Sequence, residues 1–258
     1  MKTIILAGGL GTRISEETHL KPKPMIEIGG MPVLWHIMKI YEHYGHNDFL
    51  IALGYKGEVI KNFFLDYRSN KNDFTIDLIS GKVSFEDVIT EKWNVGLHDT
   101  GSTSMTGGRL LALKRFIKLG DTFFLTYGDG VSDLNLNELL NYHKSHGKIA
   151  TLTAVRPPAR FGSLLLDNIG KVKEFKEKPQ LGEGWINGGF FVFNYEIFDY
   201  LKDSSTILEK EPLESLSRNG ELMAYMHDGF WHSMDTIRDR DNLNEIWKNG
   251  NALWKKWQ

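Results

Sequence analysis

The first candidate site is a glycine-rich loop at the start of the chain. The sequence opens MKTIILAGGLGTR, in which an apolar run over Thr3–Ala7 is followed by three glycines, Gly8, Gly9 and Gly11. Glycines let a backbone pass within hydrogen-bond distance of a ligand and present its N–H groups to phosphate oxygens. Arg13 follows in the same loop, and a guanidinium can hold a phosphate through two parallel hydrogen bonds. The pattern therefore predicts a loop that binds a phosphate-bearing ligand.

Several interpretations of this loop compete. A dinucleotide-binding fingerprint requires a glycine at the position of Ile14 and an acidic residue closing the second strand, which instead ends in ALGY. A P-loop requires Lys-Ser or Lys-Thr after the glycines, and neither follows. The remaining functional interpretation is a glycine loop that carries its own cation and is followed by the KPKP segment of Lys21 and Lys23. An ordinary glycine-rich turn stays an alternative for the glycines taken alone.

Further side chains with chemical potential follow later strands. Asp129 lies in YGDG after an apolar run, where a carboxylate has little structural purpose, and Asp235 lies in WHSMDT. Either aspartate could also cap a turn. Glu177 and Lys178 in EFKEKP are typical of a solvated strand edge when taken alone, whereas Asn187 in INGGFF can offer its amide to hydroxyl groups.

Composition excludes several classes of protein. The chain has 258 residues, of which 41% are hydrophobic and 25% charged, as in ordinary globular proteins. A net charge of −2 argues against a dedicated nucleic-acid or membrane-surface binder, although a local basic pocket stays possible. The absence of cysteine excludes disulfides, thiolate metal sites and cysteine nucleophiles. With no apolar run of membrane-spanning length and no signal-like start, we expect a cytoplasmic protein.

The elements that must position these residues alternate between strands and helices. Strands are predicted over 3–7, 48–54 and 149–155, and another begins at Thr122 and ends in the turn of TFFLTYGDG. Helices are predicted over 33–44, 57–67, 136–146 and 237–247. This alternation predicts an α/β sheet with helices on both faces. Two regions depart from it: Phe74–Ser104 suggests short strands and polar loops, and strands dominate from Ser163 onward. No linker-like segment divides the chain, so we expect a single domain over residues 1–258.

The ordered motifs resemble those of the sugar-1-phosphate nucleotidylyltransferases. LAGGLGTR, KPKPM, YGDG, EFKEKP, INGGFFVF and WHSMDT follow one another as in that family, over essentially the full chain. The segments KPKPMIEIGGMPVLWHIMK and TGSTSMTGGRL are most similar to its glucose-1-phosphate cytidylyltransferase branch. The resemblance implies a Rossmann-like mixed, mainly parallel sheet of the nucleotide-diphospho-sugar transferase type. It also implies a nucleotide-binding part over roughly 1–150 and a strand-rich sugar-binding part over 151–258.

The activity implied by the resemblance is nucleotidylyl transfer. CTP and glucose 1-phosphate would give CDP-glucose and pyrophosphate with Mg²⁺, for the synthesis of bacterial surface polysaccharide such as O-antigen dideoxysugars. The family also implies a homo-oligomer that binds neither nucleic acid nor membrane. The same chemistry with UTP or dTTP is the nearest alternative. A non-catalytic nucleotide-sugar sensor is an alternative of another class, and a dehydrogenase is a more distant one.

The resemblance also assigns roles around the nucleotide. Nucleotide binding falls on the glycine loop, the TGGR segment and the YGDG turn, that is on Leu6, Ala7, Gly8, Gly9, Gly11, Thr12, Arg13, Thr106, Gly107, Gly108, Arg109 and Gly128. Arg13 would hold the β and γ phosphates, and Lys23 would lie between the α-phosphate and the sugar phosphate, with Lys21 as a solvated neighbour. The TGGR segment predicts a glycine loop that opens a helix, so we expect Thr106 to Arg109 to line the base pocket.

The metal and sugar sites complete the predicted set. Asp129 and Asp235 resemble the metal pair of the family, and Mg²⁺ in such sites keeps waters and bridges phosphates with only one or two carboxylates. The sugar 1-phosphate would be bound through its phosphate by Lys178, through its hydroxyls by Glu177 and Asn187, and at its ring by the backbone of Gly188. We therefore expect residues 106 positions apart, Asp129 and Asp235 (235 − 129 = 106), to meet at one site.

Overall fold

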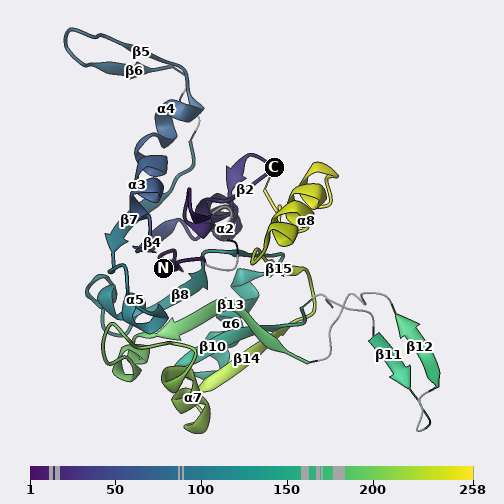
Figure 1. Cartoon of the computed structure of the whole chain (residues 1–258). Helices are drawn as coiled ribbons and strands as arrows, with labels where there is room; N and C mark the ends of the chain where they lie inside the picture. The colour runs from purple at the N-terminus through teal and green to yellow at the C-terminus, as the bar shows by residue number, and fades with distance from the viewer. Residues whose placement is uncertain are drawn as a thin grey trace.

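Seven strands of the described chain form one sheet in the order β14-β10-β13-β8-β1-β4-β7. From one edge to the other they are Leu222–His227, Ala150–Val155, Ile186–Asn194, Thr122–Tyr127, Lys2–Leu6, Asp48–Leu53 and Asn94–Asp99. β1 pairs in parallel with β4 and β8, and β4 pairs in parallel with β7. β13 runs antiparallel to both β8 and β10 (Figure 1). The predicted mixed, mainly parallel α/β sheet is confirmed.

The structure is a computed structural model that describes residues 1–11, 14, 18–86, 88, 90–157, 163–166, 169, 171–176 and 184–257. Of the predicted site residues, Thr12, Arg13, Glu177 and Lys178 lie outside the described residues. Their assigned roles stay predictions.

Adjacent residues of the central strands face opposite sides of the sheet. In β1, Ile5 belongs to one buried apolar cluster and Ile4 to the other, and Phe124 and Phe123 of β8 divide in the same way. This division follows from the two-residue repeat of a strand. Strands that are buried on both faces have nearly continuous apolar sequences, which explains why the predictions for β1, β4 and β8 succeeded.

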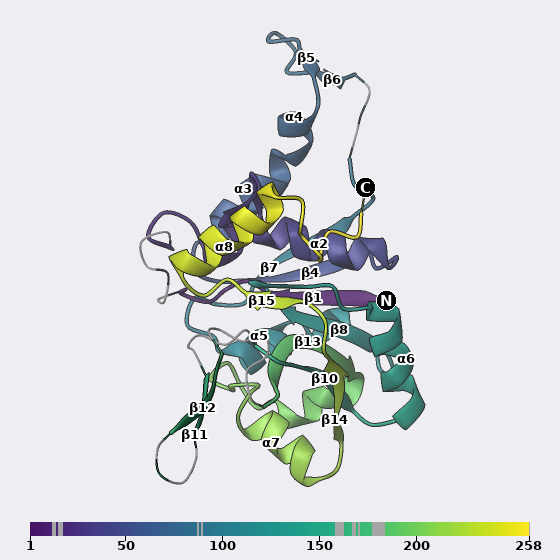
Figure 2. The same ribbon diagram turned by 90° about the vertical axis from the view of Figure 1, so that its right-hand side faces the viewer.

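Helices cover both faces of the sheet (Figure 2). One buried cluster includes apolar residues of α2 (Val33–His43), α3 (Gly57–Leu65), α6 (Leu136–His146) and α8 (Ile237–Lys248). The other cluster includes residues of α5 (Thr106–Ala112), the 3₁₀ helix η4 (Tyr195–Tyr200) and α7 (Glu211–Arg218). The helices predicted from apolar periodicity are confirmed to within about two residues. No helix in the described part of the chain is long and apolar enough to cross a membrane.

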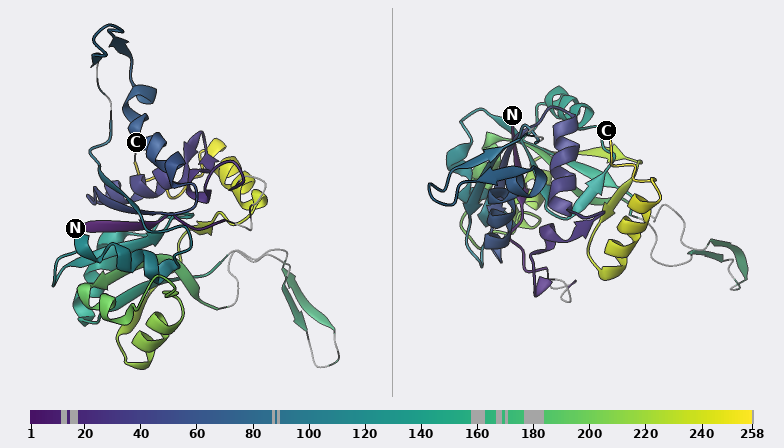
Figure 3. Two further views of the ribbon diagram at one scale, coloured as in Figure 1. Left: turned by 60° about the vertical axis from the view of Figure 1, so that its left-hand side comes forward. Right: turned by 90° about the horizontal axis from the view of Figure 1, so that it is seen from above.

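Two extensions project from the body of the molecule (Figure 1 and Figure 3). The first, here called the arm (residues 57–86), contains α3, α4 (Tyr67–Lys71) and a hairpin of β5 (Phe74–Ile76) with β6 (Val83–Phe85). The second is the hairpin of β11 (Ser163–Leu166) with β12 (Val172–Lys176). The short strands predicted after Phe74 are confirmed. The strands expected from Ser163 onward are also present, but η4 and α7 lie among them and were not predicted.

One strand of the first irregular region belongs to the main sheet instead. β7 pairs in parallel with β4 along its whole length, from Asp48 opposite Asn94 to Leu53 opposite Asp99. Its sequence, NVGLHD, mixes polar and apolar residues because β7 is a half-exposed edge strand. Short strands and polar loops were expected over residues 74–104, but it was not predicted that one of these strands extends the main sheet.

Several short elements lie outside the main sheet. The 3₁₀ helix η2 (Lys23–Met25) precedes the hairpin of β2 (Glu27–Ile28) with β3 (Met31–Pro32), and η3 (Lys114–Phe116) follows α5. β9 (Gly130–Ser132) pairs antiparallel with β15 (Trp231–Ser233). This last pairing brings the turn after β8 next to the segment before α8.

Candidate active site

A cavity of about 370 Å³ lies beyond the carboxyl ends of β1 and β8. Ligands of open α/β sheets bind at this end of the strands. The cavity is lined by Leu6, Ala7, Gly8, Gly9, Gly11, Lys23, Pro24, Ser104, Met105, Thr106, Arg109, Tyr127, Gly128, Asp129 and Asp235. The structure therefore brings together the described part of the glycine loop, the KPKP lysine and the two predicted metal ligands.

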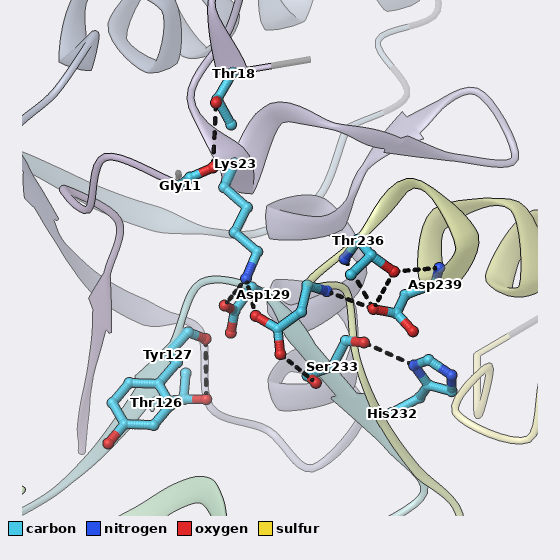
Figure 4. Close-up of polar contacts among 11 residues, drawn as sticks. Gly11, Thr18, Lys23, Thr126, Tyr127, Asp129, His232, Ser233, Thr236 and Asp239 are labelled. Carbon is cyan, nitrogen blue, oxygen red and sulfur yellow. Dashed lines mark hydrogen bonds and ion pairs between the residues drawn. The ribbon is translucent and has the colours of Figure 1, made fainter. Parts of the chain in front are cut away.

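Lys23 lies between the two predicted metal ligands. Its Nζ donates to Asp129 Oδ2 at 2.5 Å and to Asp235 Oδ1 at 2.7 Å, from a side chain that is only 13% exposed (Figure 4). Burial alone would lower the pKa of Lys23, but the charges and hydrogen bonds of Asp129 and Asp235 outweigh it and raise the pKa above its usual value. Lys21 instead pairs with Glu27 at 2.9 Å nearer the surface and does not line the cavity.

The backbone fixes the positions of both carboxylates. The Met234 N–H donates to Asp129 O at 2.9 Å, which continues the β9–β15 pairing beyond its last residue pair. The Ser233 hydroxyl donates to Asp235 Oδ2 at 3.0 Å (Figure 4). Directly after Asp235, Thr236 caps α8 in a reciprocal capping box with Asp239. Asp235 is thus held between a strand pair and a capped helix.

The two carboxylates fit the chemistry of a magnesium site. They converge on one cation, the Lys23 ammonium, so this part of the cavity already accommodates positive charge between two carboxylates. In the described part of the chain, no group of three or more His, Asp or Glu residues could hold a metal ion. Two carboxylates suffice for Mg²⁺ where substrate phosphates and water supply the remaining oxygens.

Arg109 also lines the cavity and supports its wall. Its side chain is buried, and its Nη1 donates to Leu53 O, Thr100 Oγ1 and Gly101 O at 3.0, 2.9 and 2.8 Å. Its Nη2 donates to Gly8 O at 2.9 Å. Leu53 is the last residue of β4, whereas Gly8 follows β1 and Thr100 and Gly101 follow β7, so one guanidinium ties three neighbouring strand ends together. Burial lowers the pKa of Arg109, and the charge of Asp99 partly opposes this shift.

The glycines near Arg109 serve different purposes. A Cβ at Gly8 would lie 2.2 Å from Arg109 Nη1, so the first glycine of the loop makes room for the guanidinium. Gly107 and Gly108 lie within α5 and do not line the cavity. A Cβ at Gly108 would lie 2.3 Å from Ser204 O, and one at Gly107 would lie 2.9 Å from Thr206 O. The expectation that these two glycines line a base pocket is therefore corrected, because they allow α5 to pack on residues 204–206.

Comparison with known proteins decides the family. The sequence model of the family described as nucleotidyl transferase matches residues 2–239 of this chain. The chain belongs to this family. A glucose-1-phosphate cytidylyltransferase of Salmonella typhimurium is 50% identical to it over 258 residues, which is 100% of both chains. A probable glucose-1-phosphate cytidylyltransferase of Bacillus subtilis is 47% identical over 259 residues, again 100% of both.

A solved structure shows the same fold. HddC from Yersinia pseudotuberculosis superposes on this nucleotidyl transferase with a TM-score of 0.68 and 22% identity, covering 95% of this chain and 99% of HddC. The resemblance inferred from the motifs and the predicted nucleotide-diphospho-sugar transferase fold are both confirmed.

The structure of this nucleotidyl transferase also shows a cavity residue that was not among the predicted site residues, although the YGDG motif begins with it. Tyr127, the last residue of β8, lines the cavity beside Gly128 and Asp129. Its hydroxyl accepts a hydrogen bond from Asn187 Nδ2 at 3.3 Å, so the predicted sugar-binding amide lies behind Tyr127. Gly188 O accepts a hydrogen bond from Trp231 Nε1 at 2.7 Å. Neither Asn187 nor Gly188 lines the cavity itself. The sequence could have indicated this role for Tyr127, because it ends a strand directly before the predicted site residues Gly128 and Asp129.

Proposed function

We propose that this nucleotidyl transferase converts CTP and glucose 1-phosphate into CDP-glucose and pyrophosphate. An oxygen of the sugar phosphate attacks the α-phosphorus of CTP, and the bond from that phosphorus to the pyrophosphate oxygen breaks. The main support for this class of reaction is the position of Lys23. It lies between two carboxylates in the cavity that the glycine loop also lines. The choice of CTP and glucose 1-phosphate is supported by the full-length relatives in Salmonella and Bacillus.

The cavity residues have distinct tasks in this reaction. Positioning and charge neutralisation dominate the catalysis of phosphoryl and nucleotidyl transfer, with little covalent work for the protein. Asp129 and Asp235 would hold Mg²⁺, which when bound neutralises phosphate charge. Lys23 carries a positive charge at the same place and would contact the phosphates that meet there. The backbone of Gly8 and Gly9 lines the cavity, where its N–H groups would be available to phosphate oxygens.

We also propose roles for three residues outside the described part of the chain and for Asn187. By family resemblance, Arg13 would bind the phosphates that leave as pyrophosphate, Glu177 the sugar hydroxyls and Lys178 the sugar phosphate. Asn187 would act on the sugar side from behind Tyr127. CDP-glucose made in this way would serve bacterial surface polysaccharide synthesis, such as that of O-antigen dideoxysugars.

The proposal is tested by substrate choice. The purified protein is incubated with Mg²⁺, glucose 1-phosphate and each of CTP, UTP and dTTP, and pyrophosphate release is measured. Cytosine and uracil exchange donor and acceptor at N3 and the 4-position, so a hydrogen-bonding pocket built for one base leaves groups unpaired with the other. Such a site can discriminate by ~10⁴ in kcat/KM. We expect CTP to be preferred.

The other outcomes separate the alternatives. Equal kcat/KM for CTP and UTP would reject the cytidylyl assignment and keep the reaction class. Pyrophosphate release with none of the triphosphates, together with tight binding of CDP-glucose, would favour the nucleotide-sugar sensor. A sensor has no need of a lysine bound between two acidic residues, which is why we favour the enzyme.

We also propose that the protein is a homo-oligomer. The arm exposes large apolar side chains far from the sheet, and Leu65, Leu78 and Ile79 are 77%, 86% and 100% exposed. A second copy of the chain would cover such residues, since exposed apolar groups gathered on one extension favour a protein contact. Light scattering on the wild type and on Ile79→Asp tests this. A monomeric wild type contradicts the proposal.

A further inference from the structure

One carboxylate lies behind the cavity wall and binds two residues that line it. Glu209, in the turn before α7, accepts the Tyr127 hydroxyl at Oε1 and the Thr106 hydroxyl at Oε2, both at 2.5 Å. Tyr127 and Thr106 line the cavity, whereas Glu209 does not. Both carboxylate oxygens of Glu209 therefore bind side chains of the cavity wall, and Glu209 itself does not line the cavity.

The two residues come from elements that are distant in sequence. Thr106 is the first residue of α5, 103 positions before Glu209, and Tyr127 is the last residue of β8, 82 positions before it. The Thr106 oxygen also accepts from the Leu208 N–H at 2.9 Å. The turn at 208–209 thus fastens the beginning of the Arg109 helix to the strand end that carries Asp129.

The Tyr127 ring has little freedom to choose another orientation. It packs edge-on against Phe191 with ring centroids 5.7 Å apart. On another side, a Cβ at Gly189 would lie 2.5 Å from the Tyr127 ring, so only glycine admits the ring there. The hydroxyl at the end of the ring is consequently aimed by packing and held by Glu209.

The direction of the proton at Tyr127 follows from the carboxylate. Since Glu209 accepts, the Tyr127 O–H donates to it, and the phenol oxygen is left as an acceptor for the Asn187 amide. The phenol oxygen thus donates to Glu209 and accepts from Asn187, so the surrounding side chains fix both of these contacts.

We propose that Glu209 is a positioning residue for the nucleotidyl transfer, which rests on the function proposed above. It fixes Tyr127 and Thr106 relative to each other and so sets the distance across the cavity between the wall held by Arg109 and the Asp129 site. It touches no substrate. A neutral residue of the same shape cannot replace it, because both hydroxyls donate and a glutamine amide offers only one acceptor oxygen.

The closing experiment compares two neighbouring glutamates. Glu209→Gln is matched by Glu211→Gln, which removes a surface pair with Lys202 whose side chains are 62% and 69% exposed. We expect kcat/KM for pyrophosphate release to fall about 10²-fold in Glu209→Gln, since a small misplacement of reacting groups costs about this much. The melting temperature should stay close to that of the wild type. Glu211→Gln should leave both quantities unchanged.

A second variant distinguishes positioning from general stability. Tyr127→Phe keeps the ring and removes the hydroxyl that Glu209 binds. If Glu209 acts through Tyr127 and Thr106, then Glu209→Gln should cost much less in kcat/KM in the Tyr127→Phe background than in the wild type. A lowered melting temperature with wild-type kcat/KM would instead make Glu209 a structural tie and overturn the inference.

The outcome also separates this inference from the proposed function. If the wild type releases no pyrophosphate from any triphosphate, the proposed function fails. The inference is then judged by CTP affinity in calorimetry, which Glu209→Gln must weaken and Glu211→Gln must not. Equal affinity and equal turnover of wild type and Glu209→Gln would overturn it even if the enzyme is fully active.

Discussion

Lys23 and Arg109 line the same cavity and carry the same formal charge, yet their partners differ in kind. Lys23 binds two carboxylates, Asp129 and Asp235, at 2.5 and 2.7 Å. Arg109 donates to backbone carbonyls and one threonine hydroxyl, among them Gly8 O at 2.9 Å. The pKa of Lys23 is raised by its acidic partners, which outweigh burial, whereas burial lowers the pKa of Arg109.

The difference indicates separate tasks for the two cations. The partners of Lys23 are carboxylates, for which a metal ion would compete with the lysine, whereas substrate phosphates would compete with the carboxylates for Lys23. Contacts at that end can therefore be exchanged during a reaction. Apart from the Thr100 hydroxyl, these partners of Arg109 are main-chain carbonyls at three strand ends, which move only if that end of the sheet moves. We infer that the contacts of Lys23 change when charged ligands bind, whereas the contacts of Arg109 set the shape of the cavity.

The largest expected effect is at Lys23. Lys23→Ala removes positive charge where negative charge gathers in the transition state, and losing one such preorganised contact typically costs ~10²–10³ in kcat. Lys21→Ala is the matched control, because Lys21 pairs only with the exposed Glu27 in the described site region and should cost far less. Steady-state kinetics of both variants are the measurement. If the two losses were reversed, the cation at the reacting phosphates would be Lys21.

The second effect concerns the acidic partners. Asp129→Asn and Asp235→Asn should each lower kcat by about 10²-fold while the fold stays intact. The double variant should lose much less than the product of the two losses, since residues that serve one ion act as a unit. A chelator should abolish activity and added Mg²⁺ should restore it. Strictly multiplicative losses, or a fully active Asp235→Asn enzyme, would show that the two carboxylates do not share a metal.

The third effect tests Arg109. Arg109→Lys keeps the charge but cannot reach the carbonyls of Gly8, Leu53 and Gly101 at once. Leaving buried carbonyls unpaired should lower the free energy of unfolding by about 2 kcal/mol. Urea unfolding measures this loss. Lys23→Ala serves as the contrast, because its main loss should be in kcat. A stable Arg109→Lys protein with a large loss of kcat would mean that both cations do chemistry.

The fold could be predicted wherever one kind of burial dominates a segment. α2 has a clear apolar stripe, and β1, β4 and β8 are buried on both faces, so their sequences identify them. β7 was missed because an edge strand needs no apolar run, and its place in the sheet depends on β4. Local sequence holds no information about that partner.

The site could be predicted wherever a residue type has few structural uses. Lys23, Asp129 and Asp235 were identified as site candidates, and they meet in the cavity. Gly107 and Gly108 looked like ligand-binding glycines, but the close approach that they permit is to residues 204–206. A glycine in the sequence indicates that another group approaches the backbone closely, but it does not identify that group as a ligand or as part of the protein. Glu209 belongs to no recognised motif, and only the folded chain places it behind the cavity wall.

The smallest expected effect on stability comes from adding one methyl group to the glycine loop, at Gly9, and it is compared with the same change at Gly8. A Cβ at Gly9 meets nothing within 4 Å, whereas one at Gly8 would lie 2.2 Å from Arg109 Nη1. Gly9→Ala should therefore leave the free energy of unfolding within about 0.5 kcal/mol of the wild type. If a phosphate approaches the backbone at this point, the same methyl group should weaken CTP binding by about 10-fold, as expected for one lost charge-assisted hydrogen bond.

Gly8→Ala should instead lower stability, because it displaces the guanidinium from its carbonyls. Calorimetric titration with CTP and thermal melts of both variants are the measurements. Unchanged CTP affinity in Gly9→Ala would mean that the second glycine of the loop has no ligand beside it.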